Sequence, residues 1–333
     1  MAYRAAPSPT NETLELVVRM SFAPVSGMDL PRFAGIPTFM RLPHVAPGDP
    51  RIEEVDVGIL GLPFDGGTSN RPGARHGPRA LRDASTMIRA QHPLTNVRPF
   101  EAMNVADIGD ASPNPVEVND TLERFETAVS ALPRRLRPLS VGGDHLCTLP
   151  VLRAVARDAP LGLVLLDSHT DLYPPYFGGA TLTHGNPFRQ AMEEGLVDPA
   201  RTVMIGMRGT MYDRADREFG EAHGIRIVTC EEMLARGPEE VGEEARGILG
   251  SGPAYLSFDI DFVDPAFAPG TGTPEVGGPT SAQALAMLRQ MRGLDLRGAD
   301  LVEVSPPFDP GGITAWLGAS VLFEILCLMA PEA

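Results

Sequence analysis

The sequence predicts an α/β fold, a three-layer α/β/α sandwich around an eight-stranded, mainly parallel sheet. The first observation is that, from residue 56 onward, short apolar runs alternate with amphipathic stretches, which is typical of repeated βα units. The second is that no stretch of this region has the composition of an interdomain linker. A hydrophobic content of 43% is ample for one large core. We therefore expect one α/β/α domain.

Each apolar run is expected to form one strand, and the amphipathic stretches between the runs are expected to form helices. The eight expected strands are residues 56–62, 102–108, 136–141, 161–167, 201–206, 225–229, 254–262 and 299–304. The expected helices are residues 78–89, 119–132, 147–157, 230–249, 281–292 and 314–329. Pro78 suits the first turn of its helix, where the missing N–H has no partner to lose.

Residues 1–50 differ from the rest of the chain because closely spaced prolines interrupt any long helix. We interpret them as a proline-rich N-terminal arm. Residues 51–333 are expected to form the single folded domain.

The charged residues narrow the range of functions. All 28 basic residues are arginine, so the chain has no lysine for a Schiff base or for a phosphate-binding loop. The net charge of −15 argues against nucleic acid or an anionic membrane surface as a partner, because both attract clustered positive charge. A small cationic substrate is the better expectation.

The sequence indicates a cytoplasmic protein without a membrane segment. Its first residues contain no continuous apolar leader, and the longest apolar stretch, residues 319–330, is interrupted by Glu324 and too short to span a bilayer. Three widely spaced cysteines suit reduced thiols and offer no CxxC metal site.

Candidate metal ligands follow three of the expected strands. The fourth strand ends in Asp167, His169 and Asp171, which a spacing of two places on one side, and the seventh ends in Asp259 and Asp261. His145 follows the third strand. Each motif alone also fits a polar strand end, a capping turn or a loop. Together they supply two imidazoles and four carboxylates to one edge of a parallel sheet, which favours a metal site.

The ligand set contains only nitrogen and oxygen, which favours manganese or a similar divalent ion over a thiolate-rich zinc site. Six side chains suit two ions that share bridging carboxylates. A paired centre of this kind acidifies water, so hydrolysis is the expected reaction.

The motifs resemble those of the ureohydrolase family of arginases, agmatinases and guanidino-acid hydrolases. The resemblance runs from about residue 56 to the end of the chain. Its motifs, in order, are the loop from Asp65 to Arg75, Gly142-Gly-Asp-His145, Asp167-Ser-His-Thr-Asp171, Ser257-Phe-Asp-Ile-Asp261, Pro269-Gly-Thr-Gly-Thr-Pro274 and Glu303-Val-Ser-Pro306.

The resemblance implies an arginase-like fold and two Mn²⁺ ions that hydrolyse a guanidinium group to urea and an amine. One ion would take His145, Asp167, Asp171 and Asp259, and the other would take His169, Asp167, Asp259 and Asp261. Asp171 and His184 would assist proton delivery, Glu303 would pair with the guanidinium, and Thr273 would contact it. The family further implies a homo-oligomer, either a trimer or a hexamer.

Three residues depart from the commonest family pattern and are expected to shape the substrate pocket. Leu146 replaces a small hydroxyl residue, Asn186 replaces a threonine, and Tyr173 stands where arginases have an asparagine. Arginase activity itself is therefore not expected. The stretch 176–189 resembles the guanidinobutyrase-like branch, so guanidinobutanoate, agmatine or a similar compound is the expected substrate.

Three alternatives remain open at this point. One is a nickel-dependent hydrolase of guanidine, an N-alkylated guanidine or a biguanide. Another is a non-catalytic subunit of a hetero-oligomeric ureohydrolase. A third is a single-zinc deacetylase on a related fold, which would not need His145, Asp171 and Asp261 as additional ligands.

Overall fold

The computed structural model describes residues 22–331, so residues 1–21 of the expected arm lie outside the described part. Eight strands form one sheet in the order β2-β1-β3-β8-β7-β4-β5-β6, and every neighbouring pair is parallel. The strands are β1 Val57–Leu62, β2 Val105–Asp110, β3 Arg137–Gly142, β4 Leu161–Leu166, β5 Val197–Met207, β6 Arg226–Thr229, β7 Pro253–Asp259 and β8 Asp295–Val302. The predicted fold class is confirmed.

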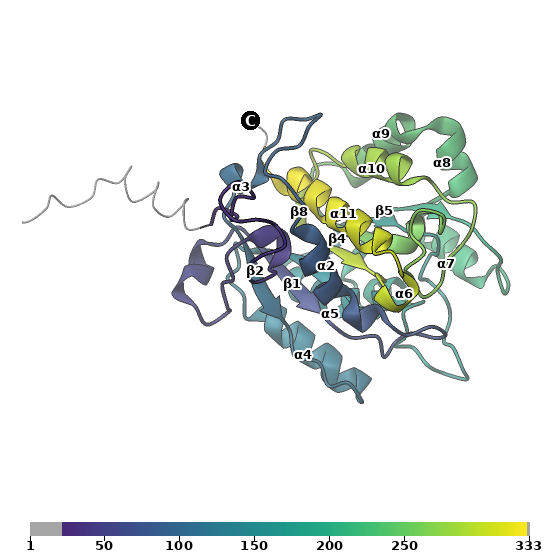
Figure 1. Ribbon diagram of the computed structural model, residues 1–333. Helices are drawn as coiled ribbons and strands as arrows, with labels where there is room; N and C mark the ends of the chain where they lie inside the picture. Colours follow the sequence, from purple (N-terminus) through teal and green to yellow (C-terminus); the bar gives the residue numbers. More distant parts are fainter. Residues whose placement is uncertain (1–21, 332–333) are drawn as a thin grey trace, which may run out of the picture.

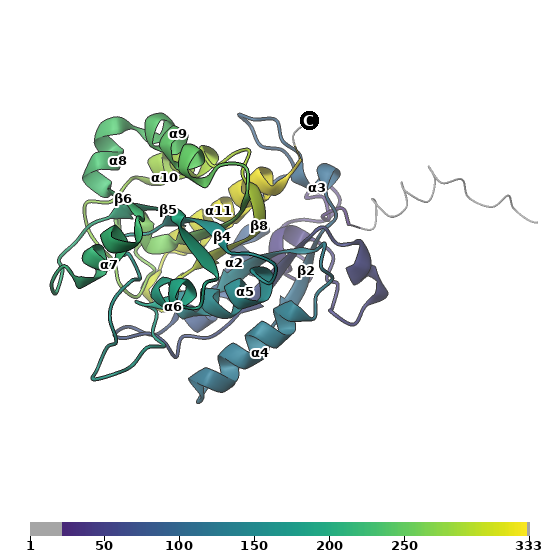
Figure 2. The same ribbon diagram turned by 180° about the vertical axis from the view of Figure 1, so that it is seen from behind.

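Helices cover both faces of the sheet (Figures 1 and 2). One apolar core joins the sheet to α2 Gly77–Ser85, α3 Pro99–Ala102, α8 Cys230–Arg236, α9 Pro238–Leu249, α10 Ser281–Arg289 and α11 Ile313–Met329. A second core joins the opposite face to α4 Val118–Ser130, α5 Thr148–Val155 and α6 Pro187–Glu193, with α7 Ala215–His223 at its margin. Helix α11 is apolar on nearly all sides because it is buried between α2, α10 and β8.

The structure differs from the sequence prediction at several helices. The single helix predicted over residues 230–249 is two helices, because Gly237 has a φ of 84° and Pro238 begins a new first turn. The short helices α3, α6 and α7 were not predicted. Helices α3 and α6 each begin at a proline and span fewer than two full turns, too short to show apolar periodicity.

The segment that precedes the sheet packs along strand β2. His44 forms a parallel bridge with Asp107, and the Val45 N–H donates to the Asp107 carbonyl at 2.9 Å. The short helical turns η1 Phe39–Arg41 and η2 Pro50–Glu54 lie in this segment, and Phe39 and Val45 are fully buried. Within residues 22–331, no helix combines the length and apolar character needed to cross a membrane.

The sheet brings the expected functional motifs together at one edge. Strands β3, β8, β7 and β4 are consecutive neighbours in the middle of the sheet. Their carboxyl ends lead directly into His145, Glu303, Asp259 and Asp167, respectively. In open parallel sheets, ligand sites lie outside these carboxyl ends.

Candidate metal centre

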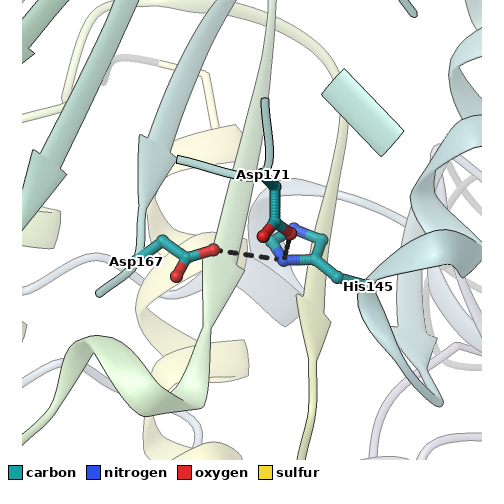
Figure 3. Close-up of side chains that lie close together, drawn as sticks. All are labelled: His145, Asp167 and Asp171. Atoms are coloured by element: carbon teal, nitrogen blue, oxygen red, sulfur yellow. Dashed lines mark ion pairs between the residues drawn. The ribbon is translucent and has the colours of Figure 1, made fainter. Parts of the chain in front are cut away.

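A first group of ligand atoms surrounds the His145 imidazole (Figure 3). Its Nδ1 atom lies 3.2 Å from Asp167 Oδ2, 3.0 Å from Asp171 Oδ2 and 3.1 Å from Asp259 Oδ2. His145, Asp167 and Asp171 each offer one atom, and these atoms all lie within 4.8 Å of one another. Three carboxylates and one imidazole thus point at the same small volume.

A second group shares Asp167 with the first. His169 Nδ1 lies 3.1 Å from Asp261 Oδ2 and 3.6 Å from Asp167 Oδ1. Asp167, His169 and Asp261 also form a set of atoms close enough for one ion. Two adjacent groups with one common carboxylate are the arrangement that a pair of ions requires.

The loop after β3 brings His145 into this cluster through a close backbone approach. A Cβ atom at Gly143 would lie 1.6 Å from the carbonyl oxygen of Phe64, so only glycine fits there.

The backbone is strained at two residues of the site. Asp171 and Glu303 have φ values of 51° and 62°, in the left-handed region that residues with a side chain rarely adopt. Such strain costs about 1–3 kcal/mol per residue and is concentrated at functional sites.

The buried carboxylates strongly perturb one another's protonation. Burial, together with the charges of Asp261 and Asp167, raises the pKa of Asp259 well above its ordinary value. Burial and the charges of Asp261 and Asp171 raise the pKa of Asp167 to about 6. Burial acts in the same direction on Asp261, but the His169 charge and hydrogen bonds from His169 and Ser168 outweigh it and lower the pKa. Without a cation, the cluster must therefore take up protons to relieve repulsion.

The residues of the cluster fit a pair of divalent cations. His145 Nδ1 and Asp167 Oδ2 are buried and have no hydrogen-bond partner among the residues that the structure describes. Buried polar atoms are normally paired, so two orphaned atoms that face each other indicate a missing electrophile. Nitrogen and oxygen donors without thiolate match manganese or nickel better than a structural zinc site.

A buried chain of hydrogen bonds orients the His145 ring. The hydroxyl of Ser257 donates to Asp300 Oδ1 at 2.6 Å, so its oxygen accepts the His145 Nε2–H at 2.8 Å. Asp300 Oδ2 in turn accepts from Tyr255 at 2.7 Å and from Thr148 at 2.8 Å. This chain keeps the proton on Nε2 and leaves Nδ1 free for a cation. Asp300 was not predicted from the sequence, because its side-chain partners lie on two other elements, β7 and α5.

We expect Ser257→Ala to weaken binding of the ion at His145, because the ring loses the group that fixes its orientation. Partners of this kind typically change metal affinity about 10–100-fold. Chelator competition with Mn²⁺ measures the effect. Thr148→Val is the matched control, since it removes a bond to Asp300 that does not lead to His145. Equal affinities for the wild type and Ser257→Ala would contradict the orienting role.

Glu303, His184 and Ser69 form a second polar chain beside the cluster. Glu303 Oε1 accepts the backbone N–H of His145 at 3.1 Å and lies 2.9 Å from His184 Nδ1. His184 Nε2 lies 2.8 Å from Ser69 Oγ and accepts the Ser69 N–H at 3.1 Å. Burial lowers the pKa of His184, but the charge and hydrogen bond of Glu303 outweigh this effect and raise it to about 9.

A pocket of about 400 Å³ opens onto the chain formed by Glu303, His184 and Ser69 and onto part of the ligand cluster. Its lining includes four of the predicted ligands or proton-transfer residues, His169, Asp171, Asp259 and His184, together with Glu303, Thr273 and Tyr173. Thr273 Oγ1 donates to Asp261 Oδ2 at 3.2 Å, so it also touches the ligand cluster. The pocket wall carries three tyrosines, because Tyr176 and Tyr212 pack against Tyr173.

Leu146 and Asn186, which were expected to shape the substrate pocket, lie outside its lining. Leu146 is fully buried in the core on the α4–α5–α6 side of the sheet. Asn186 Oδ1 accepts the N–H and the hydroxyl of Thr183 at 3.0 and 3.1 Å, which fixes the turn that carries His184. Ser69, by contrast, was not singled out by the sequence analysis, because a serine within a glycine-rich loop carries no pattern of its own.

The chain is similar over most of its length to known proteins. The model of the arginase family matches residues 55–328. The chain is 53% identical to guanidinopropionase of Pseudomonas aeruginosa, and the match covers 93% of this chain and 96% of that one. It is 45% identical to guanidinobutyrase of the same organism, and this match covers 92% of this chain and 96% of that one. Its fold matches that of proclavaminate amidino hydrolase from Streptomyces clavuligerus with a TM-score of 0.85 and 43% identity, over 90% of this chain and 99% of that one.

Proposed function

The chain belongs to the arginase family, and on that basis we propose that it is a metal-dependent amidinohydrolase. It would cleave a guanidinium C–N bond of a small guanidino compound to give urea and an amine. The observation that carries the proposal is the pocket in which Glu303 lies beside the cluster of buried ligand atoms. A carboxylate that binds a planar cation next to a hydrolytic metal pair is what this reaction needs.

The proposed ligand set uses every member of the cluster. His145, Asp167, Asp171 and Asp259 would hold one ion, and His169, Asp167, Asp259 and Asp261 would hold the other. Two divalent ions, when bound, acidify water and supply a nucleophile at neutral pH. Mn²⁺ is our first choice of metal and Ni²⁺ the second.

The residues around the cluster would orient the substrate and move protons. Glu303 is 2% exposed and presents a carboxylate to the pocket, where two oxygens match two guanidinium N–H groups. His184 bonds to Glu303 and lines the same pocket, so it is placed to protonate the leaving amine. Asp171, which also lines the pocket, would assist that proton transfer.

We propose a guanidino acid with a short tail, such as guanidinopropanoate or guanidinobutanoate, as the preferred substrate. This choice follows the names of the two relatives at 53% and 45% identity. The charges in the pocket do not decide between an acidic and a basic substrate tail, because a positive residue, Arg71, and a negative residue, Glu275, both line it. One methylene changes discrimination by about 1–3 kcal/mol, or roughly 10–200-fold, so chain length should be resolved clearly.

We also propose a cytoplasmic homo-oligomer. The segment ahead of η1 exposes three large apolar side chains, Met28, Phe33 and Ile36, each at least 87% exposed. A surface of this kind suits burial against a second copy. All three cysteines are buried and free, in keeping with a reducing compartment.

Urea release by the purified, metal-analysed protein tests the proposed function. We expect two ions per chain and the highest kcat/KM with guanidinopropanoate or guanidinobutanoate, in a panel that also contains agmatine, arginine, guanidine and N,N-dimethylguanidine. If the protein bound nickel and cleaved only guanidine or N,N-dimethylguanidine, it would instead be a nickel-dependent guanidine hydrolase. Protein that binds two ions yet releases no urea from any compound would point to a non-catalytic subunit instead.

A further inference from the structure

Both ring nitrogens of His184 are already engaged inside the pocket. Nδ1 lies 2.9 Å from Glu303 Oε1, and Nε2 lies 2.8 Å from the Ser69 hydroxyl oxygen and 3.1 Å from the Ser69 backbone nitrogen. The His184 side chain itself is nearly buried, whereas Ser69 is exposed at the pocket surface. In this arrangement, a proton that leaves Nε2 for the pocket meets Ser69 first.

The two groups that Ser69 offers to Nε2 are not equivalent. A backbone N–H can only donate, so it can pair only with an Nε2 atom that carries no proton. A hydroxyl can donate to the bare nitrogen or accept from its N–H. Of these two described partners of Nε2, the hydroxyl alone can remain bonded while His184 gains or loses a proton.

The loop that carries Ser69 is fixed on both sides. Asp65 Oδ2 accepts the Gly73 N–H at 2.7 Å and the Arg75 N–H at 3.2 Å. Asp144, buried below the loop, accepts the Gly67 N–H at 2.7 Å, and the Gly67 carbonyl accepts the His184 N–H at 2.9 Å. The loop and His184 therefore form one hydrogen-bonded unit, which holds the hydroxyl in place without help from substrate.

We propose that Ser69 relays the proton that His184 delivers to the leaving amine. The His184 Nε2–H bond breaks as a new O–H bond forms at Ser69, and the original hydroxyl proton moves to the amine nitrogen, so the hydroxyl is regenerated. His184 ends as a neutral ring, whose bare Nε2 then accepts the Ser69 backbone N–H. The relay rests on the proposed function, because that reaction supplies the amine.

Removal of the hydroxyl tests the relay. We expect Ser69→Ala to retain both ions and to lower kcat about 10–100-fold, with KM changed less than about threefold. This loss is part of the roughly 10²–10⁴-fold that a general acid contributes to the rate. The solvent deuterium isotope effect on kcat should rise, since proton delivery becomes rate-limiting. Ser69→Thr, which restores a hydroxyl, should recover kcat to within about threefold of the wild type.

Thr68→Val is the matched control, because it removes a hydroxyl from the residue next to Ser69. The Thr68 hydroxyl has no hydrogen-bond partner in the described part of the chain. We expect its isotope effect to equal that of the wild type. An unchanged kcat in Ser69→Ala, or Ser69→Thr as slow as Ser69→Ala, would overturn the relay while leaving the proposed function intact. A metal-loaded wild type that cleaves no guanidino compound would overturn both.

Discussion

Asp259→Asn is expected to abolish activity while the fold remains intact. Asp259 Oδ2 lies 3.1 Å from His145 Nδ1, and Oδ1 accepts the Asp261 N–H at 2.8 Å. Asparagine keeps the shape and the second of these bonds but removes the charge that two ions would share. We expect the metal content to fall from two ions per chain to one or fewer. Turnover should decrease at least about 10³-fold, which corresponds to about 4 kcal/mol in the activation barrier.

Stability separates this prediction from simple unfolding. Burial and the charges of Asp261 and Asp167 raise the pKa of Asp259 well above its ordinary value, so they favour the protonated form of this side chain in the metal-free wild type. Asparagine imitates that protonated form, so the free energy of unfolding of the metal-free protein should change by less than about 1 kcal/mol. The wild type should gain about 2.7 kcal/mol at a metal concentration of 100 Kd, and the variant should gain much less.

Thermal unfolding with and without Mn²⁺, together with elemental analysis, measures both effects. Asp295→Asn is the matched control: it makes the same chemical change at an exposed aspartate at the start of β8, which pairs with Arg297. That variant should bind two ions as the wild type does. Two retained ions and normal turnover in Asp259→Asn would refute the proposed ligand set.

The fold class could be predicted from the sequence because the pattern of apolar runs is local and recurs along the chain. Each strand of a covered parallel sheet is a short apolar run, so all eight were found, with boundaries displaced by up to four residues. Strand β5, for example, begins at Val197, whereas the prediction began it at residue 201, because Asp198, Pro199 and Arg201 interrupt the apolar run. The helix break at Gly237 could also have been found, since Gly-Pro is a strong break signal.

The candidate ligands were recognisable because their spacing follows strand geometry and their residue types are unusual in a buried strand. The residues that orient the ligands and His184 could not be recognised from the sequence. Ser257, Asp300 and Ser69 are ordinary residues that acquire a role only through partners distant in the sequence. His145 and Ser257 are 112 positions apart, and Ser69 and His184 are 115 apart. Such pairings depend on the tertiary fold, which a single sequence does not specify at the level of individual contacts.

Glu303→Gln is expected to leave the metal centre intact and to impair recognition of the guanidinium. Glu303 is buried at the end of β8 and belongs to neither group of candidate ligand atoms. Glutamine keeps an oxygen that can accept from His145 N–H and His184, but it lacks the negative charge. A buried cation that loses its carboxylate partner costs about 3–5 kcal/mol. We therefore expect kcat/KM to fall about 10²–10³-fold with two ions still bound.

A binding measurement separates this effect from chemistry. Guanidinium chloride, titrated calorimetrically into the metal-loaded protein, should bind the Glu303→Gln variant at least about 10-fold more weakly than the wild type. Glu275→Gln is the matched control, because Glu275 is a carboxylate that also lines the pocket but lies 4.0 Å from His169 Nε2 rather than beside His184. If the Glu275 variant lost guanidinium affinity and the Glu303 variant kept it, the cation would bind beside Glu275 instead. The proposed pairing of Glu303 with the guanidinium would then be wrong.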